Sequence, residues 1–149
     1  MRFPHKIETR NDAMKYVILI ALFGYCIASR QQSVAITGKL MCGSKPASGV
    51  KVKLWEEDRG PDPDDLLDED KTDSTGGFTL KGSESELMTI DPVFKVYHDC
   101  DDGYKPGKRK VKFRIPPSYI FTGPVAKRTF DIGVLNLETV FPEEERDLI

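Results

Sequence analysis

Residue types that could carry out catalysis are sparse in this chain, and His98 is the strongest candidate among them. His98 stands two residues before Cys100 in a stretch of alternating apolar residues, so its side chain should face the core. A general base needs an orienting partner, and Asp99 would point to the opposite side of an extended segment. The chain also lacks the Gly-x-Ser-x-Gly motif that exposes a nucleophilic serine. We therefore interpret His98 as a core residue and predict no catalytic site.

The acidic stretch from Glu56 to Asp73 raises the question of a calcium site, because hard cations bind several carboxylate oxygens. Its spacing does not match the calcium loop of an EF-hand. Residues 29–149 contain one histidine and two cysteines, which fall short of the four ligands of a zinc site. We interpret the stretch as a solvated surface loop in which Leu66 and Leu67 dock the chain or form a short edge strand. We predict no metal and no cofactor.

Basic residues occur at every second position in two separate stretches, which places each set on one face of a β-strand. The sets are Lys108, Lys110, Lys112 and Arg114 in one stretch, and Lys51 and Lys53 in the other. If the two strands lie close together, they form a surface that could bind anionic headgroups, sulfated glycans or an acidic protein. The alternative is a solvated face whose charge the acidic loop neutralises, within the chain or across a dimer.

The N-terminal region predicts secretion. Lys15 precedes an apolar run from Tyr16 to Ala28 that ends in small residues, the pattern of a signal peptide. We predict that residues 1–28 are removed and that cleavage follows Ala28 or Ser29. Residues 1–13 lengthen the charged region, as an upstream extension would if translation began at Met14. A signal anchor is the alternative, although the run is short for a bilayer.

The cysteines fit an extracellular location. Cys26 lies in the predicted signal peptide, which leaves Cys42 and Cys100. An even pair in a secreted chain predicts one disulfide, with two free thiols as the alternative. Both cysteines lie near the ends of predicted strands, as a bridge between strands of a common core requires.

Short alternating segments separated by glycine and proline turns recur from Val34 to Glu138. We expect the stretches around residues 34–42 and 50–55 to pair as a hairpin across the Gly43–Gly49 turn. Helical propensity is confined to Glu84–Thr89, which allows one short helix. The pattern predicts an all-β fold, an antiparallel β-sandwich of seven to eight strands, over residues 29–149. A formal charge of −2 over 149 residues argues against nucleic-acid binding.

Several motifs resemble the nematode transthyretin-like proteins, which are secreted relatives of transthyretin. They are Gly38–Cys42 (GKLMC), Pro46 with Gly49–Leu54 (GVKVKL), Asp73–Phe78 (DSTGGF), Ile90–Pro92 (IDP), Tyr97–Cys100 (YHDC), Ile115–Pro116 with Tyr119, and Phe130–Glu138 (FDIGVLNLE). The resemblance implies a prealbumin-like sandwich, secretion and the Cys42–Cys100 bridge, without an agreed activity. Related hydroxyisourate hydrolases use several histidines and a Tyr-Arg-Gly-Ser terminus, whereas this chain ends in Asp147-Leu148-Ile149.

We therefore expect an extracellular binding protein that is not an enzyme. Its partner would be an extracellular protein, a lipid or a small molecule, and homo-oligomerisation stays open. The alternative function is a carrier of small hydrophobic molecules in a channel between subunits, and a hydrolase is the weakest reading.

Overall fold

The computed structural model describes residue 16 and residues 29–57 and 63–148. The predicted signal peptide therefore lies outside the described residues, apart from Tyr16. Among the described residues, no helix is long and apolar enough to cross a membrane.

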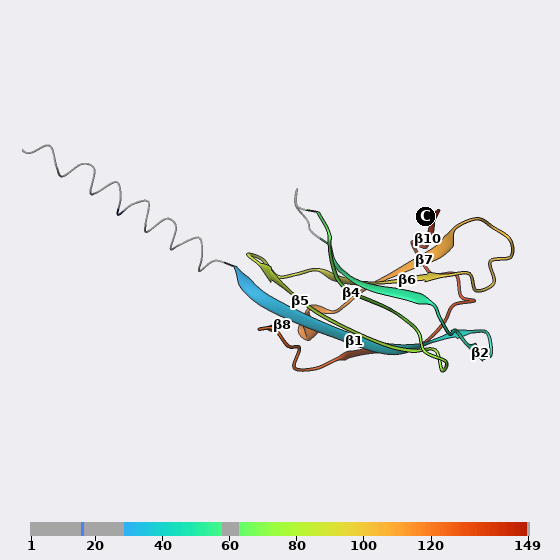
Figure 1. Ribbon diagram of the computed structural model, residues 1–149, viewed down its shortest axis with the longest axis horizontal. Coiled ribbons are helices and arrows are strands. Elements are labelled where there is room, and N and C mark those ends of the chain that lie inside the picture. Colours follow the sequence, from blue (N-terminus) through green and yellow to red (C-terminus); the bar gives the residue numbers. More distant parts are fainter. Residues whose placement is uncertain (1–15, 17–28, 58–62, 149) are drawn as a thin grey trace, which may run out of the picture.

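The described chain folds into two β-sheets that pack face to face (Figure 1). The first contains β1 (Arg30–Cys42), β2 (Lys45–Pro46), β5 (Gly77–Glu86), β8 (Phe121–Thr122) and β9 (Phe130–Asn136). The second has the order β10 (Glu145–Asp147), β7 (Lys108–Arg114), β6 (Pro92–His98), β3 (Lys51–Glu56) and β4 (Asp65–Lys71). The predicted all-β sandwich is confirmed. Its pairings are antiparallel except that of β1 with β9, which is parallel.

Strand β1 organises the first sheet. It pairs with β5 along ten residues, from Arg30↔Glu86 to Lys39↔Gly77, and its other edge receives β8 and then β9. The predicted hairpin between β1 and the 50–55 strand is wrong, because β3 belongs to the second sheet. Within the expected turn, β2 folds back on the end of β1, with Cys42 opposite Lys45. The chain then crosses to the other sheet after Gly49.

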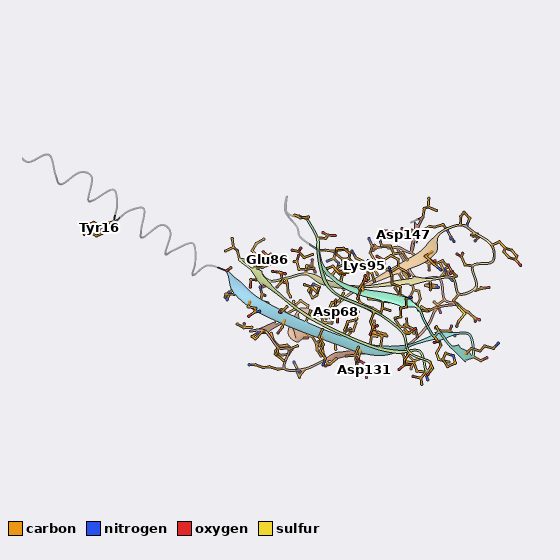
Figure 2. The ribbon with its side chains drawn as sticks, viewed as in Figure 1. Tyr16, Asp68, Glu86, Lys95, Asp131 and Asp147 are labelled. Carbon is orange, nitrogen blue, oxygen red and sulfur yellow. A yellow bond between two sulfur atoms is a disulfide. The ribbon has the colours of Figure 1, made fainter. Side chains whose placement is uncertain are left out.

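One other local expectation, a short helix at Glu84–Thr89, differs from the structure. Glu84–Glu86 complete β5 instead of starting a helix, because β1 extends to Arg30 and supplies their pairing partners. Within the described residues 29–57 and 63–148, helical geometry occurs instead as one 3-10 turn, Pro117–Tyr119. In the acidic stretch, the alternative of an edge strand is confirmed as β4. The β5 backbone N–H of Lys81 donates to Asp68 of β4 at 2.9 Å, which joins the two sheets along one side (Figure 2).

The core lies between the inward faces of the two sheets. Val52 and Leu54 of β3 and Phe94 and Val96 of β6 are fully buried. The Phe94 ring stacks on Phe78 of the opposite sheet, with centroids 4.6 Å apart. Burial of these side chains leaves the alternate residues of β3, β6 and β7 on the outer face of the second sheet.

Candidate anion-binding face

The basic residues predicted from sequence meet on the outer face of the second sheet. We call this surface the basic face and define it by Lys51 and Lys53 of β3, Lys95 of β6, and Lys108, Lys110, Lys112 and Arg114 of β7. The strand register aligns these residues in rows. One row runs from Lys51 through Tyr97 to Lys110, and the next runs from Lys53 through Lys95 to Lys112. Because β6 lies between β3 and β7, the two predicted sets belong to one surface.

Lys95 is the member that the sequence prediction missed (Figure 2). Its side chain is only 8% exposed, and its ammonium group lies 2.9 Å from Glu57 and 4.9 Å from the centre of the Trp55 ring. Alternation with the inward residues Phe94 and Val96 could have placed it on the outer face. The carboxylate and the aromatic ring stabilise its positive charge, which is needed because this lysine is largely desolvated.

Carboxylates neutralise much of the basic face. Those of the acidic stretch pair with β3 and β6, as with Lys53 and Glu69 at 3.2 Å. This agrees with the alternative in which the loop neutralises the surface within the chain. Glu145, in the C-terminal strand β10, contacts both Lys110 and Lys112, at 3.2 and 2.9 Å.

Other partners complete the pairing on β7. Arg114 contacts Asp91 at 2.6 Å, and Lys108 pairs with Asp99. In both pairs the cation is well exposed, so each pair contributes little to stability and leaves its cation available to a competing anion.

A hollow of about 530 Å³ opens at the end of the basic face near the β3–β4 edge. Its lining consists of Gly49, Lys51, Lys53, Lys71, Tyr97, Lys108 and Asp147. Lys51 and Lys71 face each other across β3 and β4. Both are exposed, and neither has an ion pair with any residue that the structure describes. Like charges directly opposite each other are unfavourable, and a bound anion would relieve that repulsion.

Tyr97 forms the aromatic wall of the hollow. Its ring centre lies 5.8 Å from the Lys53 ammonium group, and partial burial raises the pKa of its hydroxyl. The phenol therefore stays protonated at neutral pH and can donate a hydrogen bond to an anion held by the lysines.

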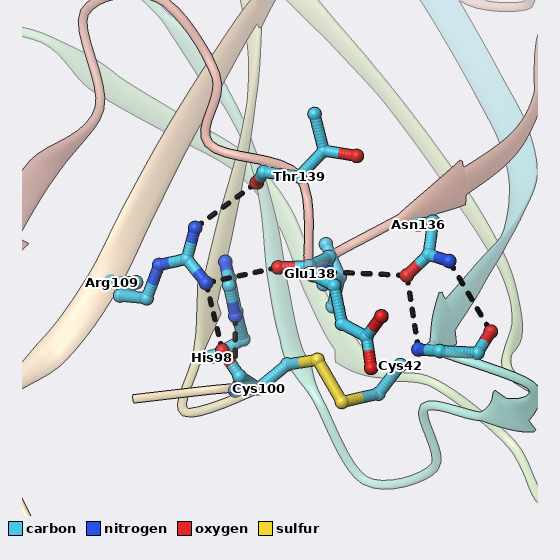
Figure 3. Close-up of a disulfide and its surroundings, with 9 residues drawn as sticks. Cys42, His98, Cys100, Arg109, Asn136, Glu138 and Thr139 are labelled. Carbon is cyan, nitrogen blue, oxygen red and sulfur yellow. Dashed lines mark hydrogen bonds between the residues drawn. A yellow bond between two sulfur atoms is a disulfide. The ribbon is translucent and has the colours of Figure 1, made fainter. Parts of the chain in front are cut away.

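A disulfide connects the end of β1 in the first sheet to the second residue after β6 of the second sheet (Figure 3). Cys42 and Cys100 are bridged with their Cα atoms 5.7 Å apart, so the predicted disulfide is confirmed. His98 is 2% exposed, and its Nδ1 accepts a hydrogen bond from the Cys100 backbone N–H at 3.2 Å. Burial, reinforced by the nearby Arg109 cation, lowers the pKa of His98 to about 4. The imidazole is therefore neutral at physiological pH and belongs to the core.

Arg109 holds the C-terminal segment beside this disulfide (Figure 3). Its guanidinium group donates to both carboxylate oxygens of Glu144 at 2.5 and 2.8 Å. It also donates to the backbone carbonyl oxygens of Cys100, Leu137 and Thr139. These contacts lower the pKa of Glu144 and raise that of Arg109. The network occupies its donors within the protein and is structural.

Metal binding finds no support in the described part of the chain, where no three His, Cys, Asp or Glu side chains gather closely enough to hold an ion. The fold and site thus define a disulfide-bridged β-sandwich with a partly neutralised basic face.

The comparisons with known proteins agree with this architecture. The model of the Transthyretin-like family matches residues 37–116, and the chain belongs to that family. Transthyretin-like protein 46 of Caenorhabditis elegans is 64% identical over 135 residues, covering 90% of this chain and 75% of the relative. Transthyretin-like protein 33 of the same organism is 52% identical, covering 79% of this chain and 82% of the relative. Transthyretin-like protein 5, also from that organism, is 45% identical, covering 91% of this chain and 99% of the relative.

None of these three names refers to an enzymatic activity. Among solved structures, part of a 9R-lipoxygenase from Cyanothece aligns with a TM-score of 0.39 and 18% identity, covering 92% of this chain and 18% of that chain. That likeness is too weak to carry an argument.

Proposed function

We propose that this chain is a secreted extracellular binding protein and not an enzyme, and that its basic face binds an anionic partner. The observation that carries the proposal is the hollow in which Lys51 and Lys71 lie opposed, lined also by Lys53 and Lys108. Neither Lys51 nor Lys71 has an ion pair with a residue in the described part of the chain. The lining combines four lysines and one aromatic hydroxyl with a single carboxylate, that of Asp147. This excess of positive charge matches a ligand that carries phosphate, sulfate or carboxylate oxygens.

The arrangement favours binding over a purely structural role for these lysines. Paired lysines such as Lys53 and Lys95 already have carboxylate partners in the fold. Lys51 and Lys71 add like-charge repulsion across two strands, and no residue that the structure describes forms an ion pair with either of them. Binding of an anion between them would turn that repulsion into attraction.

Charge-removing variants test this proposal. Purified mature protein, and a variant with Lys51→Gln and Lys71→Gln, would be measured for binding to immobilised heparin and to vesicles containing an anionic phospholipid. A control with Lys81→Gln and Lys127→Gln removes the same charge from exposed positions outside the basic face. We expect the hollow variant to bind about tenfold more weakly, because each lysine contributes a screened, partly exposed interaction.

Equal binding by the hollow variant and the control would refute a role for the hollow. Absence of binding to either anionic material by the unmodified protein would overturn the proposed function. Loss of binding to one material alone would identify the class of anionic partner.

The alternative function, a carrier of small hydrophobic molecules, has one observation in its favour. A mainly apolar groove of about 560 Å³ lies at the opposite end of the second sheet, with Ile90, Pro92, Ile115 and Ile120 in its lining. This groove is formed within one chain, whereas the sequence-based expectation placed the ligand between subunits. Fluorescence titration with a fatty-acid analogue would test it, and Ile120→Asp should abolish binding if the groove is the site.

A further inference from the structure

The C-terminal strand β10 carries its acidic residues onto the basic face. It pairs antiparallel with the outer edge of β7, with Glu145 opposite Lys110, Arg146 opposite Arg109 and Asp147 opposite Lys108. Alternation along the strand directs Glu145 and Asp147 to the side of the lysines and Arg146 to the other side. The two carboxylates therefore belong to β10, which lies beside the basic face and pairs with it only through β7.

Both carboxylates occupy positions that an external anion would take. Glu145 bridges the ammonium groups of Lys110 and Lys112, and the hydrogen bonds from these two lysines lower the pKa of Glu145. Asp147 lines the hollow together with Lys51, Lys53 and Lys71. Of the two carboxylates of β10, that of Glu145 therefore lies against the lysines of β7, and that of Asp147 lies at the hollow.

The lysine contacts of Glu145 are weak, whereas strand β10 itself is firmly attached to the fold. The Glu145 side chain is 50% exposed, and exposed pairs of this kind exchange readily with other ions. Arg146, in contrast, donates to both carboxylate oxygens of the buried Asp102 at 2.8 and 2.5 Å. Gly107 also meets the end of the strand, since a Cβ there would collide with the backbone carbonyl of Asp147. A ligand could replace the carboxylates on the lysines while β10 stays in place.

We propose that Glu145 and Asp147 are built-in competitors that an anionic ligand must displace from the basic face. This inference rests on the proposed function, because it concerns the regulation of that same face. A single anion gains little by replacing one carboxylate with another. A polyanion that engages several lysines at once gains from multivalency. The strand therefore restricts binding to densely charged partners.

The decisive experiment compares three proteins for binding to heparin at one fixed ionic strength. The test variant carries Glu145→Gln and Asp147→Asn, which preserve side-chain shape and the latch formed by Arg146. The control carries Glu84→Gln and Glu143→Gln, which remove the same charge elsewhere. We expect the test variant to bind about fivefold tighter than the unmodified protein, and the control to change by less than about twofold.

The outcomes separate the two proposals. If the unmodified protein binds heparin and the test variant binds no better than the control, the competitor role is wrong while the proposed function stands. If none of the three proteins binds, the proposed function fails and the competitor role fails with it. A second variant, Asp102→Asn, loosens the latch while leaving every lysine and both carboxylates in place. It should increase amide hydrogen exchange at Lys108 and Lys110 and also tighten heparin binding, and unchanged binding despite faster exchange would count against displacement.

Discussion

Replacing Arg109 with methionine should destabilise the fold strongly, because the guanidinium group joins three parts of the chain. Its five short contacts reach Glu144 twice and the carbonyl oxygens of Cys100, Leu137 and Thr139. Methionine keeps the apolar stem and removes all five donors. Glu144 would then be left largely buried and without its ion-pair partner. Breaking a buried pair by removing one partner typically costs about 3–5 kcal/mol, and we expect a loss of about that size here.

Urea denaturation of the disulfide-bonded protein, followed by Trp55 fluorescence, would measure the free energy of unfolding for Arg109→Met. A double-mutant cycle with Glu144→Gln provides the control, since the two changes should be strongly non-additive if they remove one interaction. The carbonyl contacts should leave Arg109→Met more damaging than Glu144→Gln. A loss below about 1 kcal/mol for Arg109→Met, or simple additivity, would refute this account of the C-terminal segment.

Three further outcomes are expected. Replacing both Cys42 and Cys100 with alanine should lower the free energy of unfolding by about 4 kcal/mol, since the bridge closes a segment of 58 residues, and chemical denaturation would measure it. Because the pKa of His98 is lowered to about 4 in the fold, the unfolded chain takes up the proton first, and stability should fall as pH drops from about 6.5 to about 4. His98→Asn should flatten that part of the stability profile, and an unchanged profile would contradict the assignment. Gly76→Ala should lower the melting temperature by several degrees, because Gly76 has a φ of 81° and the added Cβ would collide with the carbonyl oxygen of Leu40. A Gly76→Ala variant with an unchanged melting temperature would show that the turn can rearrange.

The sandwich was predictable from sequence because alternation reports which side of a strand is buried. Val52 and Leu54 on β3 and Val111 on β7 are buried as their spacing indicates. Alternation does not report which strand lies alongside, so the short turn after Cys42 predicted a hairpin that the structure replaces with a crossing between sheets. Tertiary pairing likewise overrode local propensity at Glu84, where the long β1 supplied partners.

The candidate site was predictable only in part, for a related reason. The β7 lysines belong to one alternating run, and their common face follows from spacing alone. Lys71 stands in an acidic stretch, and its place beside the hollow depends on how β4 pairs with β3. Glu145 stands in a charged tail that resembles a frayed end. Its contacts with Lys110 and Lys112 depend on the pairing of β10 with β7, which the spacing of charges in the tail does not predict.

The two faces of β7 act on the same C-terminal segment. The inward side chain of Arg109 holds Glu144 and the carbonyl oxygens before it, while the outward side chains of Lys110 and Lys112 contact Glu145. Consecutive acidic residues therefore meet different environments, one largely buried and one half-exposed. The buried contact fixes the position of the segment, and the exposed one can exchange with a ligand. A single alternating strand can in this way anchor a segment firmly and still leave its neighbouring carboxylate available for displacement.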